Sequence, residues 1–304
     1  MHRLLILSKH TGAYRDLVAA ARLPDLELAA GADVSVDVVF GEPSLIRAAL
    51  PSLSGVRWVQ STWAGVEPLL DPTLRRDYVL TNARGVFGPL MTEYVFGYLL
   101  AHERLMFEKR DSQQAGEWDS KPPGTLRGKT IGLIGVGTIG AALARTAKHF
   151  GMMVKGYTRE SESCSDVDAY YHGDDRLTFA ADLDYLVAIA PNTALTRKLV
   201  DADLLAALPA RAVFVNPGRG SIVDEEALAA ALQARRLGGA VLDVFEQEPL
   251  PRDHVFWRTP NVLITSHTAA LSFPPDIAPI FIDNYRRFAA GHLLRYRVDF
   301  EQGY

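Results

Sequence analysis

The stretch "GLIGVGTIG", residues 132–140, indicates the fold of this chain more clearly than any other. It contains the pattern GxGxxG, made of Gly135, Gly137, Thr138, Ile139 and Gly140 with Val136 between the first two glycines. In such a loop the first glycine permits a tight turn, the second lets the backbone approach a pyrophosphate, and the third lets the next helix pack closely on the sheet. The pattern alone is weak, because a glycine-rich turn without a ligand also satisfies it.

The neighbouring segments strengthen this interpretation. An apolar run at residues 130–136 precedes the helix-like segment 138–151, and a second apolar run follows at residues 153–158. A strand, a glycine turn, a helix and another strand are typical of a dinucleotide-binding Rossmann unit. The helix N-terminus of such a unit offers free N–H groups and a positive dipole to phosphates. We therefore expect the loop to bind a dinucleotide.

Short apolar runs alternate with helix-like segments along the rest of the chain. Before the glycine loop they lie at residues 4–8, 34–41, 56–62 and 78–83, and after it at residues 183–190, 212–218, 238–245 and 261–267. Strands that alternate with helices predict parallel sheets covered on both faces. The fold class is therefore α/β, with two doubly wound parallel-sheet domains.

A polar segment rich in Gly and Pro, residues 113–130, follows a long amphipathic helix expected at residues 91–110. We expect a Rossmann cofactor domain at residues 98–274. It is inserted in a flavodoxin-like substrate domain of residues 1–97 plus 275–304, which the C-terminal helix completes.

The composition of the chain indicates which kinds of binding partner are unfavourable. The net charge of −4 and the pI of about 6.1 do not favour nucleic acid or a membrane surface, since both attract a basic face. The single cysteine, Cys164, allows neither a disulfide framework within the chain nor a cysteine metal cluster, and it fits a reducing cytosol. The N-terminus lacks the pattern of a signal peptide. We expect a cytoplasmic protein with no bound metal.

Three polar side chains follow three of the strands expected after the loop. They are Arg219, Glu248 and His267. Ligand sites in open α/β sheets lie at the carboxyl ends of strands. Histidine serves acid–base chemistry near neutral pH, and arginine holds carboxylates. Taken singly, each residue has an ordinary explanation as a solvated loop or capping residue. Together they predict a site for dehydrogenation of a hydroxy acid.

The segments "GLIGVGTIG", "NPGRGSIVDEEAL", "AVLDVFEQEPLP" and "ITSHTAA", in this order and spacing, resemble the D-isomer-specific 2-hydroxyacid dehydrogenase family. The resemblance covers nearly the whole chain, including "STWAGVEPLL" at residues 61–70. The ending "VDFEQGY" and the short length most resemble its glyoxylate/hydroxypyruvate reductase A branch. The resemblance implies an NAD(P)-dependent oxidoreductase acting on CH–OH groups, which reduces a small 2-oxo acid of the glyoxylate or hydroxypyruvate type to the D-2-hydroxy acid.

The resemblance also assigns roles in the reaction. Arg219 would bind the carboxylate and keto oxygen of the substrate, and His267 would protonate the keto oxygen. Glu248 would orient the imidazole and raise its pKa. The backbone of Ala64 and Gly65 would hold the other end of the carboxylate.

Further implied roles concern the cofactor and assembly. Asp243 would contact the nicotinamide carboxamide. The segment at residues 190–196, with Pro191 and Thr196, would line the adenosine side. The family also implies a homodimer formed through the cofactor domains.

Two residues depart from the family pattern or have an open role. Ser266 stands where the family usually has proline, which alters the stiffness of the loop but not the pair of Glu248 and His267. Trp63 either shapes the substrate pocket and limits the size of the acid, or packs in the core.

The segment "VKGYTRES", residues 154–161, concerns the choice of dinucleotide. Thr158 occupies the position where NAD-binding sites place an acid for the ribose hydroxyls. Thr158 can donate a hydrogen bond to a 2′-phosphate, and Arg159 can pair with it by charge. Glu160, if it turned inward, would restore an NAD site. We predict a preference for NADP(H), with NAD(H) as the alternative.

Other functions fit the same residues. One is a dinucleotide-sensing regulatory binding protein of the same fold, since fold does not fix function. Another is a related dehydrogenase for a different acid, such as formate or a phosphonate. The sequence leaves open which 2-oxo acid is physiological and in which direction the reaction runs.

Overall fold

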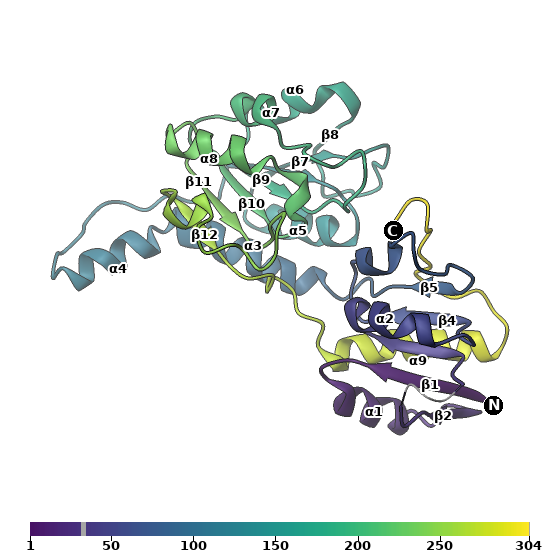
Figure 1. The fold of residues 1–304 in the computed structure, drawn as a ribbon. Coiled ribbons are helices and arrows are strands. Elements are labelled where there is room, and N and C mark those ends of the chain that lie inside the picture. The colour runs from purple at the N-terminus through teal and green to yellow at the C-terminus, as the bar shows by residue number, and fades with distance from the viewer. Residues whose placement is uncertain (32–34, 304) are drawn as a thin grey trace. The chain divides into compact units, whose positions relative to one another are not determined.

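The computed structural model describes residues 1–31 and 35–303 and divides into two compact units. Unit 1 comprises Met1–Val86 and Ser272–Tyr304, and unit 2 comprises Phe87–Leu271. Figure 1 shows unit 1 in purple, blue and yellow and unit 2 mainly in teal and green. The border expected between residues 97 and 98 falls inside a helix, α3 (Gly88–Glu103), and this helix belongs to unit 2 throughout.

Unit 1 contains a five-stranded parallel sheet. Its strands are β1 (His2–Leu7), β2 (Leu26–Leu28), β3 (Val38–Gly41), β4 (Trp58–Ser61) and β5 (Val79–Thr81), in the order β2-β1-β3-β4-β5. This order is the flavodoxin-like one, as predicted. The expected strand at residues 34–41 starts at Val34, which lies outside the described residues, as does Tyr304 of the ending "VDFEQGY". Sequence patterns missed β2, because the exposed Glu27 in its middle interrupts the apolar run.

The C-terminal helix completes unit 1. The helices of this unit are α1 (Thr11–Ala20), α2 (Pro43–Ala49) and α9 (Pro274–Ala289), with short 3-10 turns η1 (Leu50–Ser52) and η2 (Glu67–Leu70). Helix α9 packs against α1, and Phe281 of α9 stacks on Phe40 of β3 and Trp58 of β4. All three aromatic side chains are fully buried. The last helix therefore contributes to the core of the first domain, as the sequence predicts.

Unit 2 contains a seven-stranded parallel sheet. Its strands are β6 (Thr130–Ile134), β7 (Met153–Tyr157), β8 (Ala169–Tyr171), β9 (Tyr185–Ala188), β10 (Val213–Asn216), β11 (Gly239–Leu242) and β12 (Val262–Ile264). The order is β12-β11-β10-β9-β6-β7-β8. The chain reverses its direction across the sheet between β6 and β9, which is the switch point where Rossmann folds bind ligands. The glycine loop follows β6 and lies at this point.

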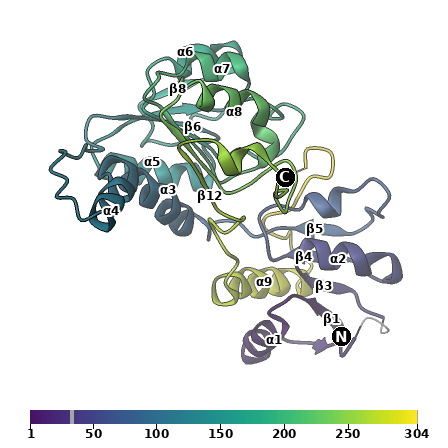
Figure 2. The same ribbon diagram turned by 60° about the vertical axis from the view of Figure 1, so that its left-hand side comes forward.

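Helices cover both faces of this sheet, as Figures 1 and 2 show. The helices of unit 2 are α3, α4 (Met106–Gln114), α5 (Thr138–His149), α6 (Arg176–Ala180), α7 (Ala202–Ala207) and α8 (Glu225–Gln233), and all but α4 pack on the sheet. The 3-10 turns are η3 (Gly173–Asp175), η4 (Gly220–Ile222) and η5 (Val255–Arg258). Val187 and Val215 pack with α3 and α5, whereas their neighbours Leu186 and Phe214 pack with α6, α7 and α8. This alternation is that of strands buried on both faces.

The long helix expected at residues 91–110 is broken in the structure. Leu105 has a φ of 53°, in the left-handed region, and it separates α3 from α4. A left-handed residue cannot continue the i to i−4 hydrogen bonds, so a new helix begins after it. Helix α4 has no buried residue and projects from the rest of unit 2 in Figure 1. Among the described residues, no helix is long and apolar enough to span a bilayer.

Candidate active site

The glycine loop brings helix α5 close to the sheet. Gly135 has a φ of 97°, and a Cβ there would lie 3.0 Å from the backbone of Ala190. A Cβ at Gly140 would lie 2.5 Å from the oxygen of Gly135. At Gly137, by contrast, a Cβ would meet nothing within 4 Å. The outer glycines are therefore needed for packing, while the middle one faces open space.

The N-terminus of α5 fits the pyrophosphate of a dinucleotide. Gly137 caps the helix without a side-chain hydrogen bond, and Thr138 and Ile139 form its first turn with no acidic residue. The first N–H groups of a helix have no partner within the helix, and its dipole favours an anion there. The residues at this turn therefore suit a phosphate group, as expected from the sequence.

The end of β7 carries the residues expected to select the dinucleotide. Thr158 is buried, and its hydroxyl donates to the carbonyl of Ser161 at 2.8 Å. A hydroxyl has one proton, so in this conformation Thr158 has none left for a phosphate. Arg159 and Glu160 are both exposed. Of the two side chains expected to hold a 2′-phosphate, Arg159 is the better suited in this structure.

His172, which no sequence motif singled out, lies beside Thr158. Its Nδ1 is 2.9 Å from the carbonyl oxygen of Thr158, and its Nε2 is 2.8 Å from Oε1 of Glu162. Both oxygens only accept hydrogen bonds, so satisfying both requires a doubly protonated, cationic ring. These two hydrogen bonds, the one to Glu162 first, raise the pKa of His172. An imidazole with a raised pKa therefore lies next to the position where NAD-binding sites carry an acid.

The loop after β9 carries Pro191 and Thr196. The hydroxyl of Thr196 donates to the carbonyl of Pro191 at 2.6 Å and accepts from the N–H of Thr193 at 2.8 Å. These bonds close the loop into a compact turn. The loop follows β9, which neighbours β6 at the switch point, and its expected contact with the adenosine stays a prediction.

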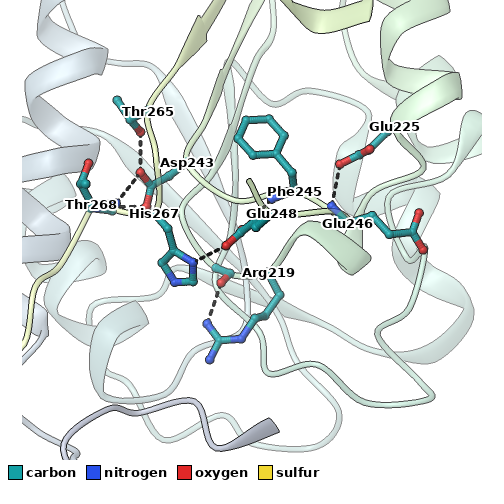
Figure 3. A network of polar contacts seen from close by, with 11 residues as sticks. Arg219, Glu225, Asp243, Phe245, Glu246, Glu248, Thr265, His267 and Thr268 are labelled. Carbon is teal, nitrogen blue, oxygen red and sulfur yellow. Dashed lines mark hydrogen bonds and ion pairs between the residues drawn. The ribbon is translucent and has the colours of Figure 1, made fainter. Parts of the chain in front are cut away.

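Glu248 and His267 form a hydrogen-bonded pair. Oε2 of Glu248 lies 2.8 Å from Nδ1 of His267, as Figure 3 shows. The other carboxylate oxygen accepts from the N–H of Phe245 at 3.0 Å, which fixes the carboxylate. Because Nδ1 is engaged by the carboxylate, Nε2 is the ring atom that can exchange a proton with a substrate.

The pair shifts the pKa values of both partners. The hydrogen bond to Glu248 raises the pKa of His267, against the opposing effects of burial and of the positive charge of Arg219. Burial on its own would raise the pKa of Glu248, but the hydrogen bonds from His267 and from the Phe245 N–H hold it below the usual value. The carboxylate therefore stays ionised at neutral pH and favours the imidazolium form of the histidine.

Arg219 lies in the loop after β10 and extends toward the pair of Glu248 and His267. A Cβ at Gly220 would lie 1.9 Å from the carbonyl carbon of Phe245, so only glycine lets this loop pass so close to the Glu248 segment. Buried Asn216 donates to the carbonyl of Arg219 at 2.9 Å, and Nη1 of Arg219 donates to the carbonyl of Gly218 at 2.7 Å. In Figure 3 the guanidinium and the imidazole extend to the same side of the strand ends.

Asp243, at the end of β11, holds the segment that carries His267. Its buried carboxylate accepts from the hydroxyl of Thr265 at 2.5 Å and from the N–H groups of Thr268 at 2.8 Å and Ala269 at 2.9 Å. The N–H of His267 donates to the carbonyl of Asp243 at 2.8 Å. His267 itself has a φ of 56°, in the left-handed region. The role foreseen for Asp243, a contact with the nicotinamide carboxamide, stays a prediction.

The substrate residues expected in unit 1 lie in the loop after β4. The N–H of Trp63 donates to Oγ of Ser61 at 2.9 Å, and the carbonyl of Ala64 accepts from the side chain of Asn82 at 2.8 Å. Gly65 follows in the same loop. The Trp63 residue is 38% exposed, so it does not belong to the buried core of unit 1. Its part in a substrate pocket stays a prediction, as do those of Ala64 and Gly65.

Comparison with known proteins identifies the family. The family model described as "D-isomer specific 2-hydroxyacid dehydrogenase, NAD binding domain" matches residues 96–269. The chain belongs to the D-isomer specific 2-hydroxyacid dehydrogenase family. Membership makes it an NAD(P)-dependent oxidoreductase of the 2-hydroxyacid dehydrogenase class.

Within the family, the chain resembles the glyoxylate/hydroxypyruvate reductase A branch. It is 32% identical over 250 residues, 79% of either chain, to the glyoxylate/hydroxypyruvate reductase A of Serratia proteamaculans strain 568. A crystal structure of a family member from Aeromonas salmonicida subsp. salmonicida A449 is 41% identical, with a TM-score of 0.94 over 98% of this chain and 99% of that one. An NADPH-dependent glyoxylate/hydroxypyruvate reductase from Sinorhizobium meliloti, solved with NADP and sulfate, is 28% identical, with a TM-score of 0.88 over 100% of both chains.

In this dehydrogenase, one unit brings together Arg219, Glu248 and His267, which stand on three separate strand ends. The residues expected for the cofactor lie in the same unit, at strand ends, in the loops that follow them or in the first turn of α5. Sequence patterns missed His172 and the link between Asp243 and Thr265. Such links depend on side-chain direction across the sheet, which periodicity does not report.

Proposed function

We propose that this dehydrogenase reduces a small 2-oxo acid of the glyoxylate or hydroxypyruvate type to the D-2-hydroxy acid, with NADPH as the preferred cofactor. The observation that carries the proposal is the hydrogen-bonded pair of Glu248 and His267 next to the guanidinium of Arg219. The pair is part of the unit that carries the glycine loop. Relatives named glyoxylate/hydroxypyruvate reductase support this substrate class.

The three side chains have complementary tasks. The bound nicotinamide cofactor supplies the hydride that the keto carbon receives. Arg219 pairs with the substrate carboxylate and keto oxygen through its planar fork of donors, which orients the acid and polarises the carbonyl. His267 gives the proton on Nε2 to the oxygen of the 2-oxo group, so that hydride and proton together convert this carbonyl to the alcohol. Glu248 stabilises the imidazolium form before that transfer.

Residues of unit 1 are also proposed to bind the substrate. The backbone N–H groups of Ala64 and Gly65 would bind the far end of the carboxylate. Trp63, which is exposed, would limit the size of the acid. Small acids such as glyoxylate are favoured for this reason.

A panel of acids, assayed with both NADPH and NADH, tests the substrate class. We expect cofactor oxidation with glyoxylate and hydroxypyruvate, and little turnover in the oxidative direction with formate or a phosphonate. Cofactor binding without turnover of any 2-oxo acid would instead favour the dinucleotide-sensing protein. The panel also identifies which acid is used best.

The preference for NADPH rests on the end of β7. No acid occupies the position of Thr158. Arg159 follows it in the chain, and the imidazole of His172, whose pKa is raised, lies beside it. Two solved relatives contain NADPH or NADP, which agrees with the proposal. Glu160 remains the residue that would favour NADH if its carboxylate bound the ribose hydroxyls.

Replacing Arg159 by alanine is expected to raise the KM for NADPH by about tenfold or more and to change the KM for NADH by less than about twofold. One charge-assisted hydrogen bond contributes roughly 1.5–3 kcal/mol, and NADH lacks the phosphate that accepts it. Steady-state kinetics with both cofactors give the two constants. Glu160→Ala is the matched control, and it should leave the KM for NADPH unchanged or lower it. An equal rise for both cofactors in Arg159→Ala would remove Arg159 from cofactor selection.

We also propose a homodimer formed through the cofactor units. Met106 and Phe107 are large, exposed apolar side chains of α4, the helix that projects from the rest of unit 2 in Figure 1, and Trp118, after this helix, is also exposed. Large apolar side chains left exposed favour an interaction surface. Sedimentation velocity should give twice the chain mass of 33.4 kDa, and a monomer at micromolar concentration would contradict the proposal. A cytoplasmic location without nucleic-acid or membrane partners stays a prediction.

A further inference from the structure

Tyr94 begins a chain of hydrogen bonds that ends at the loop of His267. It lies on α3, a helix that carries none of the three site residues. Its hydroxyl is 2.7 Å from Oγ1 of Thr265, and Oγ1 of Thr265 is 2.5 Å from Oδ1 of Asp243. One chain of hydrogen bonds thus links α3 to the segments that follow β12 and β11, although these elements lie far apart in the sequence.

The last acceptor determines which atom is the donor in each of these hydrogen bonds. The carboxylate of Asp243 only accepts, so the hydroxyl of Thr265 must donate its single proton to it. Thr265 then has no proton for Tyr94, and Tyr94 must be the donor to Thr265. Burial raises the pKa of Tyr94 well above its ordinary value, so this donor keeps its proton through the whole range of working pH. Hydrogen bonds in such a chain strengthen one another.

The chain of hydrogen bonds ends on the carboxylate of Asp243, which fixes the backbone next to His267. Oδ1 of Asp243 also accepts from the N–H of Thr268, and Oδ2 accepts from the N–H of Ala269. These two amides directly follow His267, whose left-handed φ of 56° is sparsely populated for a residue with a Cβ. A backbone in this region persists only where neighbouring bonds hold it. Asp243 and its donors supply those bonds.

We propose that Tyr94 is a positioning residue, which acts through Thr265 and Asp243 to hold the His267 loop in the geometry for proton transfer. This inference rests on the proposed function of His267 as proton donor. It assigns Tyr94 no contact with substrate or cofactor. The charged groups that set the pKa of His267 are Glu248, Arg219 and Asp243, and the position of the loop decides how close the imidazole lies to each of them.

Tyr98 provides a matched control on the same helix. Its ring packs edge-on against that of Tyr94, with the centroids 4.9 Å apart. Among the described residues, the structure gives Tyr98 no hydrogen bond to the His267 loop. Tyr94→Phe and Tyr98→Phe therefore remove the same atom from neighbouring rings, but only the first breaks the chain.

Three readouts test the proposal. For Tyr94→Phe we expect kcat for glyoxylate reduction to fall about tenfold with the KM for glyoxylate within about twofold. The pKa of His267, measured by NMR titration of the imidazole, should fall, because a looser loop weakens the bond to Glu248. Amide exchange at Thr268 and Ala269 should become faster. Tyr98→Phe should leave all three readouts at the wild-type values.

Variants at the middle link guard against a misfolded Tyr94→Phe protein. Thr265→Val removes the hydroxyl at nearly the same volume and should reproduce the three changes, whereas Thr265→Ser keeps the hydroxyl and should restore the wild-type values. A Tyr94→Phe protein that matches Tyr98→Phe in kcat, in the pKa of His267 and in amide exchange would overturn the proposal. The proposal would also be overturned if Thr265→Val and Thr265→Ser gave the same kcat, the same pKa of His267 and the same amide exchange.

The readouts separate this inference from the proposed function. If the wild type reduces no 2-oxo acid, the proposed function fails, but the pKa of His267 and the amide exchange still report on the positioning by Tyr94. If His267→Ala abolishes reduction while the Tyr94 and Thr265 variants keep all wild-type values, only the positioning role fails.

Discussion

Replacing His267 by alanine should lower kcat for reduction of the 2-oxo acid by roughly 10³-fold. Positioned general acids contribute about 10²–10⁴-fold, and alanine leaves water as the only proton source at that place. Removal of the donor should leave the KM for the acid within a few-fold, since Arg219 supplies most of the binding. Stopped-flow or steady-state measurement of NADPH oxidation gives both constants.

Two controls accompany this variant. NADPH binding, followed by fluorescence, should stay close to the wild-type value, because the glycine loop and the end of β7 are unchanged. His292→Ala changes an exposed histidine of unit 1 and should keep wild-type kinetics. A rate for His267→Ala equal to that of the wild type would exclude His267 as the proton donor.

Arg219→Lys should lower kcat/KM for the 2-oxo acid by roughly 100-fold, mainly through a higher KM. The planar guanidinium can give two parallel hydrogen bonds to one carboxylate, whereas an ammonium acts as a point charge. Loss of one to two charge-assisted hydrogen bonds corresponds to about 3 kcal/mol. Steady-state kinetics over a range of acid concentrations separate KM from kcat.

This substitution keeps the positive charge beside His267 and Glu248, so it tests the fork geometry more than the charge. Arg236→Lys, at an exposed residue that follows α8, is the matched control and should have no effect. If Arg219→Lys kept the wild-type kcat/KM, bidentate binding of the carboxylate by Arg219 would be wrong.

The sequence was sufficient to predict most strands of both sheets and which strand ends carry the site residues. Apolar runs followed by Arg219, Glu248 and His267 are local patterns, and the rule that parallel strands share a carboxyl edge brings their ends together. The same reasoning identified the glycine loop at the switch point. It failed for β2 and β8, because neither lies in a buried apolar run: β2 contains the exposed Glu27, and β8 is only half-buried. It also failed at Leu105, because no glycine or proline marks the break between α3 and α4.

Side-chain partners were beyond the reach of sequence patterns. The hydroxyl of Thr158 looked available for a phosphate, but the structure directs it to the carbonyl of Ser161. Tyr94 and Thr265 are 171 residues apart and looked like ordinary positions of a helix and a strand end. Their hydrogen bond depends on how α3 packs against the sheet, which only the three-dimensional arrangement reveals.

The proposed reaction depends on the pair of Glu248 and His267. The pH dependence of kcat/KM tests the role of this pair. Reduction needs protonated His267, and the bond to Glu248 raises its pKa above the ordinary value of about 6.5. For the wild type, kcat/KM should therefore be constant at lower pH and fall as pH rises through that raised pKa. In Glu248→Gln the main cause of the shift is lost, while burial and Arg219 still lower the pKa, so the fall should move to lower pH.

The decisive measurement is the profile of kcat/KM for glyoxylate against pH, at saturating NADPH, for the wild type and Glu248→Gln. We expect kcat/KM to fall at alkaline pH in both proteins, with the midpoint of the fall at lower pH in Glu248→Gln. An unchanged midpoint in Glu248→Gln, or activity that rises with pH in the wild type, would contradict this expectation.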